Sequence, residues 1–269
     1  MSAVEYVATT QNRPEKRSVD EFPDRFDQPE DAYEGFFRAD SAKNAPAWAA
    51  VMSYPHVRVS ASGNMSRYET PNAYADAADW TSREATGWVR SEGVPPRRLH
   101  ESVDKVHLLG GWTRFNVDGD PILENRVTYI LTRLDGSWGI QARFGVDSYA
   151  GHEIEETTVA TERLAKQFVT HVAEGDLTAC AKLCRLPLTV VHIGNVITAT
   201  SESDIVELLR SYSGRGINLK RAKAVQTGTR GAVVEVVTEF NDGERESGIV
   251  VVGKQHDKWL IAGTSKIAR

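Results

Sequence analysis

The sequence predicts an α+β fold made of two tandem domains that share one order of helices and strands. Three observations lead to this prediction. The 269 residues suffice for two ordinary domains. Each half places helical patterns before a run of strands with hairpin turns. Landmark residues recur in the same order in both halves, as they do in an internal repeat.

The helices of the first half follow from apolar periodicity and from capping residues. Tyr33 and Phe36 fall on one apolar stripe, which predicts a helix over residues 30–40. Thr70 can cap a later helix whose first turn contains Pro71. The predicted helices of the first half are residues 30–40, a short segment through Trp48, and a longer segment that opens at Thr70.

The strands of the first half are separated by turn signals. Asp118-Gly119 lies between two apolar runs and predicts a tight hairpin, and Asp135-Gly136 gives a similar signal further on. The predicted strands are residues 56–60, 103–109, 112–117, 122–133 and 138–145.

The second half repeats this order. A long helix over residues 161–174 ends at Gly175, and Asp176 can cap the short helix that follows. Ser201 and Asp204 have the spacing of a capping box. The predicted strands of the second half are residues 188–192, 231–240, 248–254 and 258–266.

Landmarks align the two halves and set the expected domain boundaries. The paired landmarks are Pro55 with Pro187, Asp118-Gly119 with Asp242-Gly243, and Trp138 with Trp259. The expected parts are a polar N-terminal tail (1–29), a first domain (30–150), a linker (151–159) and a second domain (160–269). The tail lacks the apolar core of a signal peptide and is either a mobile tail or a strap on the body.

Composition argues against several classes of function. The formal net charge is -5 and no basic stripe is visible, so no nucleic-acid partner is expected. No stretch approaches the roughly 18 apolar residues of a membrane span, so no membrane partner is expected. Cys180 and Cys184 are expected to be core residues, since no further ligands lie at zinc-like spacing. We therefore expect no metal, no cofactor and a cytoplasmic location.

The order of elements in the second half points to a family. A helix is followed by Gly175-Asp176, a short helix, the strand from Pro187 to His192, a capped helix and a meander. This order resembles that of nuclear transport factor two-like (SnoaL-like) domains of the cystatin-like α+β superfamily. The resemblance covers nearly all the chain outside the tail, without an invariant signature.

The resemblance implies two tandem cone-shaped domains. Each would be a curved antiparallel sheet wrapped around a long helix with two further helices, leaving a conical pocket. Apolar runs such as residues 249–252 must be covered on both faces, and a second sheet can cover one of them. We therefore expect the two sheets to pack as a pseudo-dimer within one chain, with further oligomerisation left open.

The resemblance also implies where pocket residues lie. Enzymes similar to ketosteroid isomerase place a base, a tyrosine and an acid around the pocket. The matching positions are His192, Phe168 and Ile249 in the second half, and Ser60, Phe36 and Thr128 in the first. Since Phe168 and Ile249 cannot donate hydrogen bonds to an enolate, isomerisation of that type is not expected.

Two further sites each have a functional and a structural interpretation. His192 is the candidate catalytic residue, because a histidine can accept or donate a proton near neutral pH; otherwise it is a strand-end histidine bonded to backbone or water. Arg126 shares a strand face with Glu124 and Thr128. This pattern is loosely similar to the arginine and carboxylate of the superfamily's epoxide hydrolases, or it is a surface ion pair.

Three functions remain open at this point. The first is a binding module that holds a small, mostly apolar molecule in one or both pockets. The second is a lyase, isomerase or cyclase that acts on a hydrophobic metabolite with His192 as general acid or base. The third is a scaffold that binds protein through its surface.

Overall fold

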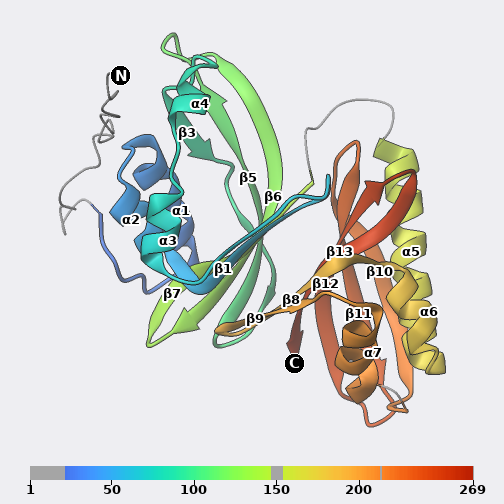
Figure 1. Ribbon diagram of the computed structural model, residues 1–269. Helices are drawn as coiled ribbons and strands as arrows, with labels where there is room; N and C mark the ends of the chain where they lie inside the picture. Colours follow the sequence, from blue (N-terminus) through green and yellow to red (C-terminus); the bar gives the residue numbers. More distant parts are fainter. Residues whose placement is uncertain (1–21, 147–153, 213, 269) are drawn as a thin grey trace, which may run out of the picture.

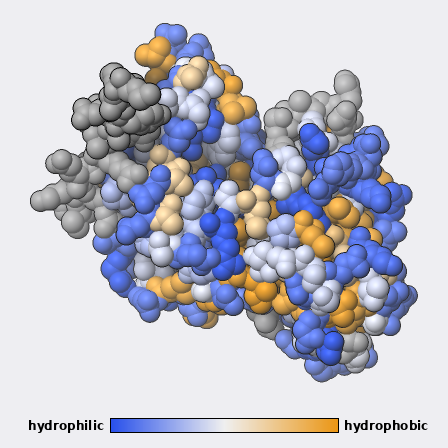
Figure 2. Space-filling view, in the orientation of Figure 1, coloured by the Kyte–Doolittle hydropathy of each residue, from blue (hydrophilic) through white to orange (hydrophobic). Residues whose placement is uncertain are grey.

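The computed structural model describes residues 22–146, 154–212 and 214–268, and it shows two α+β domains side by side (Figure 1). In each domain the helices lie on the outer face of a sheet, and the two sheets face each other in the middle of the molecule. On the face shown in Figure 2, hydrophilic side chains separate several small groups of apolar atoms. Within the described ranges, no helix is long and apolar enough to cross a membrane.

The helices of the first domain begin where the sequence places proline and capping side chains. The first helix starts at Pro29, with Glu30 and Asp31 in its first turn, where the helix dipole favours negative charge. The side chains of Asn44 and Thr70 cap the second and third helices. The helices are α1 (Pro29–Ser41), α2 (Ala45–Ala50), α3 (Pro71–Asp76) and α4 (Thr81–Glu84).

The first sheet has the strand order β2-β1-β7-β6-β5-β3, and β4 also pairs with β5. Its strands are β1 (Met52–Ser60), β2 (Met65–Tyr68), β3 (Arg90–Gly93), β4 (Arg97–Glu101), β5 (Lys105–Phe115), β6 (Pro121–Leu134) and β7 (Ser137–Gly145). The pair β1 and β7 is parallel and the other pairs are antiparallel.

The second domain has a longer first helix and a sheet of order β10-β11-β12-β13-β8-β9. Its helices are α5 (Ile154–Glu174), α6 (Leu177–Lys182), α7 (Glu202–Leu209) and the 3-10 turn η2 (Arg210–Tyr212). Its strands are β8 (Cys184–His192), β9 (Asn195–Ala199), β10 (Ile217–Thr227), β11 (Gly231–Phe240), β12 (Arg245–Gln255) and β13 (Lys258–Ala268).

The two domains share one topology, which confirms the predicted fold class of two tandem cone-shaped α+β domains. In both sheets the first strand pairs in parallel with the last strand and antiparallel with the second. Pro55 and Pro187 are each the fourth residue of that first strand, and Trp138 and Trp259 are each the second residue of the last. The domains differ where β3 and β4 together take the place of the single strand β10.

One feature of the predicted sheets was wrong. Each sheet is mixed and not wholly antiparallel, because the first strand joins the edge of the meander beside the last strand. A parallel pair needs a long connection between its strands, and the intervening helices and strands of each domain provide one.

Apolar side chains from both sheets form one cluster between the domains. The first domain contributes residues of β1, β6 and β7, among them Val59 and Phe144, and the second contributes residues of β8, β11, β12 and β13, among them Ile249 and Val251. Each domain also has its own core between its sheet and its helices. Whether the contact reproduces a dimer interface, as the term pseudo-dimer implies, stays a prediction.

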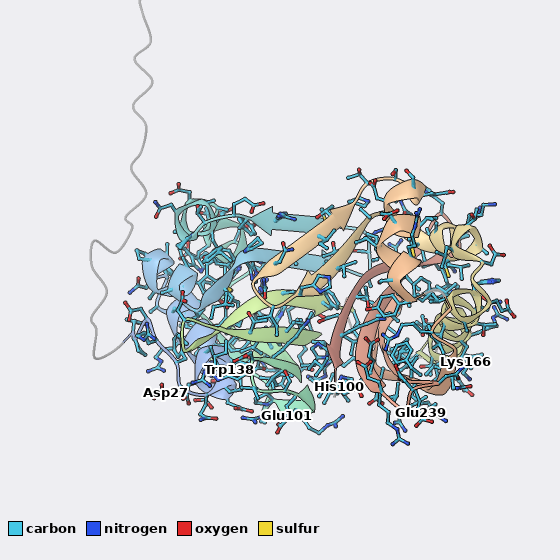
Figure 3. The ribbon with its side chains drawn as sticks, turned by 90° about the horizontal axis from the view of Figure 1, so that it is seen from below. Asp27, His100, Glu101, Trp138, Lys166 and Glu239 are labelled. Atoms are coloured by element: carbon cyan, nitrogen blue, oxygen red, sulfur yellow. The ribbon has the colours of Figure 1, made fainter. Side chains whose placement is uncertain are left out.

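A chain of hydrogen bonds also crosses this contact. His100 Nε2 lies 3.0 Å from Glu235 Oε1, His100 Nδ1 lies 3.0 Å from His107 Nδ1, and His107 Nε2 lies 2.9 Å from Ser265 Oγ. Beside it, buried Lys105 donates from Nζ to the Val191 carbonyl oxygen at 2.7 Å. Figure 3 shows His100 where the two sheets meet.

The expected boundaries differ from the observed elements at two places. Helix α5 starts at Ile154, so the second part of the expected linker is helical; Glu155 and Glu156 occupy its first turn, where acids stabilise a helix start. Residues 151–153 lie outside the described residues. Of the expected tail, residues 1–21 also lie outside them, whereas Phe22 and Phe26 pack into the first core as a strap.

Candidate functional site

A cavity of about 290 Å³ lies in the first domain between helices α1 and α4 and the sheet. Its wall combines aromatic side chains with an unusual number of charged ones. The charged residues of the wall are Arg58, Arg83, Arg114, Arg143 and Asp40. Four guanidinium groups therefore face one carboxylate in a small, partly enclosed space.

Strand alternation places three of these arginines in the cavity wall. Arg58 of β1 and Arg143 of β7 are direct neighbours in the parallel register of the two strands. Neighbouring residues on adjacent strands point to the same face of a sheet. Arg114 reaches the same wall from β5, two strands beyond β7. Two like charges opposite each other on a sheet destabilise it, so this arrangement is costly for the fold.

Aromatic rings hold each guanidinium group in place. Arg58 lies 4.9 Å from the ring centroid of Tyr74 and 5.2 Å from that of Trp48, and it donates a hydrogen bond to the Tyr74 hydroxyl. Arg143 lies 4.7 Å from the ring centroid of Phe36, and Arg114 lies 4.6 Å from that of Trp112. Stacking on aromatic faces restricts the arginine side chains before any ligand arrives.

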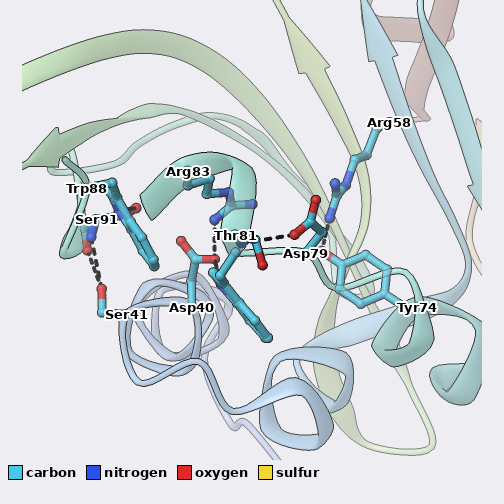
Figure 4. Close-up of polar contacts among 10 residues, drawn as sticks. Asp40, Ser41, Arg58, Tyr74, Asp79, Thr81, Arg83, Trp88 and Ser91 are labelled. Atoms are coloured by element: carbon cyan, nitrogen blue, oxygen red, sulfur yellow. Dashed lines mark hydrogen bonds and ion pairs between the residues drawn. The ribbon is translucent and has the colours of Figure 1, made fainter. Parts of the chain in front are cut away.

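Asp40 of α1 is already engaged within the domain. Its side chain is only 4% exposed, and Oδ1 accepts hydrogen bonds from Arg83 of α4 and from the indole N–H of Trp80 at 3.1 Å (Figure 4). Among the described residues, no ion pair joins a carboxylate to Arg58, Arg114 or Arg143. The only wall carboxylate is thus committed to Arg83.

The positive charge of the wall also affects Arg114. Burial, and then the charges of Arg83 and Arg143, lower the pKa of its guanidinium to about 10. The nearby carboxylate of Asp40 acts in the opposite direction without restoring the ordinary value. A guanidinium with this pKa is still charged at neutral pH, so the wall presents excess positive charge to whatever enters it.

The second domain has a much smaller cavity, of about 50 Å³, between α5 and its own sheet. Its wall is mostly apolar and includes Phe168 and Val172. Lys266 is the one charged residue of the wall; its Nζ lies 3.6 Å from the ring centroid of Tyr212 and 3.2 Å from Glu246 Oε2. This space admits little more than water.

Four of the residues expected in pockets border these two cavities. Phe36 and Ser60 line the first cavity, and Phe168 lines the second. Ile249 borders the second cavity too, although its side chain belongs to the apolar cluster between the sheets.

Three other candidates lie away from these two cavities. In β6 the residues that line the first cavity are Asn125 and Val127, so Arg126 and Thr128 belong to the opposite face. Thr128 is fully buried and donates to Gln226 of the second domain at 2.8 Å. Arg126 instead lines a third cavity, of about 470 Å³, to which Val225 and Gln226 of the second domain also contribute, and its role in binding stays a prediction.

His192 lies at the exposed end of β8 and lines none of these three cavities. Partial burial and the neighbouring charges of Lys105 and Lys266 hold the pKa of its ring below the ordinary value. A general acid or base needs room for a substrate beside it. Its catalytic role stays a prediction that none of these cavities supports.

Four residues of the cavity wall were not expected from the sequence: Arg58, Arg83, Arg114 and Arg143. A signal was present for Arg58, because it stands two residues before Ser60, and residues two apart share a strand face. Ser60 was expected at the pocket, so Arg58 could have been expected there too. Arg143 stands between the apolar residues Ala142 and Phe144, which is a second signal.

The known proteins to which the chain is similar are solved structures. No protein-family model matches the chain, and no curated protein matches its sequence. A protein of the DUF3225 family from Pectobacterium atrosepticum is 9% identical, covers 45% of this chain and 99% of its own, and has a TM-score of 0.39. A domain with a cystatin-like fold from Nostoc punctiforme is 12% identical, with coverages of 54% and 97% and a TM-score of 0.39.

An NTF2-like protein with a cystatin-like fold from Novosphingobium aromaticivorans is 16% identical, with coverages of 42% and 81% and a TM-score of 0.35. The first and second of these three are described as proteins of unknown function.

Proposed function

We propose that this protein binds a small organic anion in the cavity of its first domain. One observation carries the proposal: Arg58 and Arg143 lie side by side in the wall, and no described carboxylate pairs with either. An acidic group placed between two guanidinium forks neutralises their repulsion and accepts charge-assisted hydrogen bonds. The ligand therefore supplies the counter-charge that the domain lacks.

The rest of the wall suits a ligand that also has an apolar part. Phe36, Phe37, Trp112 and Val127 line the cavity beside the arginines. A volume of about 290 Å³ lies at the lower end of the roughly 300–1,000 Å³ that is usual for small-molecule sites. For this cavity we therefore propose a small amphipathic acid as the ligand, where the sequence led us to expect a mostly apolar molecule.

A binding module is favoured over an enzyme that depends on His192. The histidine lies at the exposed end of β8, whereas the charged cavity lies in the other domain. The cavity wall itself contains no histidine, cysteine or lysine, and its one carboxylate is bonded to Arg83 and Trp80. Recognition of an anion needs no proton transfer, and the guanidinium groups of the wall supply the positive charge and the hydrogen-bond donors that it requires.

The test is a binding titration of the full chain with short carboxylates such as butanoate and pentanoate, followed by calorimetry and tryptophan fluorescence. Arg143→Gln keeps most of the side-chain volume and removes the charge. Because a hydrogen bond to a charged group contributes about 1.5–3 kcal/mol, we expect it to weaken binding about 10- to 100-fold.

Arg133→Gln is the matched control, since Arg133 lies in the same sheet and is exposed. It should bind the same acids as the unchanged protein does. The proposal fails if no acid of this size saturates the protein at millimolar concentration, or if Arg143→Gln and Arg133→Gln bind equally well.

A further inference from the structure

The positive charge of the first cavity is divided between two separate places on the sheet. Arg58 and Arg143 form one group on the adjacent strands β1 and β7. Arg114 stands on β5, and β6 lies between β5 and β7. Since neighbouring strands are about 4.8 Å apart, the backbone of Arg114 is about 10 Å from that of Arg143 across the sheet alone.

The register along β6 separates the two places further. Arg143 pairs with Tyr129 of β6, whereas Arg114 pairs with Leu123 of the same strand. The two arginines are therefore offset along the strands as well as across them, and both still line one cavity. The two side chains therefore enter one cavity from strands that are not adjacent.

The wall between these two places has one polar and one apolar residue on β6, Asn125 and Val127. Val127 of β6 lies between the strands that carry Arg143 and Arg114, and Phe36 and Phe37 of α1 face it across the cavity. Trp112 supports Arg114 from the same strand face. Hence a ligand would meet positive charge, then a mixed surface with one amide side chain, then positive charge again.

The charge at the Arg114 end is also uncompensated. Asp40, the one carboxylate of the wall, is bonded to Arg83 and Trp80. No ion pair joins Arg114 to a carboxylate among the described residues. Burial, and then the charges of Arg83 and Arg143, lower its pKa to about 10, while the carboxylate of Asp40 acts in the opposite direction. A single acidic group at the Arg58 and Arg143 end would leave this second charge without a partner.

We propose that the ligand is a dianion whose two acidic groups are separated by a short spacer, one group on Arg58 and Arg143 and the other on Arg114. This inference rests on the proposed function, because it requires that the cavity binds anions at all. It adds the number and spacing of the acidic groups. Arg114 would then be the residue that distinguishes diacids from monoacids.

The experiment compares monoacids with diacids of matched length on the same protein. Butanoate, pentanoate and hexanoate form one series, and succinate, glutarate and adipate form the other. We expect one diacid to bind at least 10-fold more tightly than its monoacid, and the best chain length measures the separation of the two places. Phosphonocarboxylates of the best length show whether the Arg114 end takes a carboxylate or a phosphate-like group.

Variants then assign the two ends. Arg114→Gln should reduce the diacid to the affinity of the monoacid and leave monoacid binding unchanged, whereas Arg143→Gln should weaken both. Arg114→Lys should retain part of the preference for diacids. Because each ratio is taken within one protein, a partly unfolded variant does not mimic the result; Arg133→Gln should keep the full preference.

The outcomes separate the two proposals. If monoacids bind through Arg143 and diacids bind no more tightly, the dianion inference is overturned and the proposed function stands. If diacids bind more tightly but Arg114→Gln keeps the preference, the assignment of Arg114 is overturned. If no acid of either series binds, both proposals fall together.

Discussion

The two domains build one architecture around cavities of opposite character. In register, the pair Arg58 and Arg143 of the first domain corresponds to the pair Val190 and Thr264 of the second, which are likewise direct neighbours on a parallel strand pair. The landmark spacing of the halves also matches Asp40 with Val172. It further matches Arg114 with Thr238.

The second domain thus shows that this fold needs no charge at these positions. Val172 and Thr238 line its cavity, together with Thr264, and the sheet retains the same strand order. Buried charges and like-charged neighbours cost free energy, so the arginines of the first domain are not explained by folding. The comparison within one chain therefore supports a role in recognition.

The largest effect is expected when an arginine, like the one at the matching position of the first domain, is introduced into the cavity of the second domain. Thr264→Arg puts a guanidinium into a cavity of about 50 Å³ that is mostly apolar. Overpacking and the burial of an unpaired charge should together lower the free energy of unfolding by about 3 kcal/mol or more. Urea denaturation measures the loss.

Thr264→Val serves as the control for that variant, with an expected change of about 1 kcal/mol from the lost hydrogen bond to the Ile249 carbonyl. If Thr264→Arg leaves the free energy of unfolding unchanged, the second cavity can accommodate a charge. The difference between the two cavities would then not indicate a role of the first in recognition.

A second test concerns Lys105 in the contact that joins the two regions. Burial lowers the pKa of its amine to about 7, whereas the ordinary value is near 10.4. The unfolded chain therefore binds more protons than the folded chain between these values. By linkage, the free energy of unfolding should rise as the pH increases from about 7 towards 10.

Lys105→Met should remove this dependence of stability on pH. At pH 7 it should also increase the free energy of unfolding by roughly 1 kcal/mol or more, because burying an uncharged side chain of similar length does not require the desolvation of a charge. Denaturation at pH 7 and pH 9 in both proteins measures the effect. Equal slopes with pH in the two proteins would contradict the assignment to Lys105.

A third test asks whether removing charge from the first cavity separates stability from binding. Arg143→Met keeps a long side chain against Phe36 and removes the repulsion with Arg58. The free energy of unfolding should change by less than about 1 kcal/mol, while binding of short acids falls at least 10-fold. A loss of stability as large as the loss of binding energy would mean that Arg143 is a structural residue.

The smallest expected effect on anion binding comes from Asp40. Asp40→Asn removes the one negative charge of the wall and leaves Arg83 without its partner. Anion affinity should rise a few-fold, and the free energy of unfolding should fall by about 1–3 kcal/mol because a nearly buried ion pair is broken. Unchanged or weaker anion binding would argue against a purely electrostatic role for this carboxylate.

The order of elements could be predicted from the sequence because local signals determine it. Caps at Asn44, Asp176 and Ser201 and the turn at Asp118-Gly119 act within a few residues, and all begin or end elements in the structure. Phe36 and Phe168, placed by apolar periodicity on their helices, both reach a cavity. Signals that act between residues close in the sequence were therefore sufficient to predict the order of the helices and strands.

The charged site was harder to predict because it depends on which face of each strand borders the cavity. Both faces of β6 are covered, one by helices and the other by the second sheet, so alternation alone does not tell Asn125 from Arg126. The site also joins residues from β1, β5, β7, α1 and α4, which lie far apart in the sequence. Only the pairing of strands brings them together.

The hydrogen-bond chain between the domains determines where its protons reside. An ionised carboxylate can only accept a hydrogen bond, so Glu235 accepts one from the Nε2–H group of His100. In the arrangement with both rings neutral, His100 Nδ1 accepts from His107 Nδ1, and His107 Nε2 accepts from Ser265. The single hydroxyl proton of Ser265 then does not bond the Val191 carbonyl oxygen 3.5 Å away. In this arrangement the two imidazoles are opposite tautomers, and all three hydrogen bonds donate in one direction, from Ser265 of β13 through the first domain to Glu235 of β11.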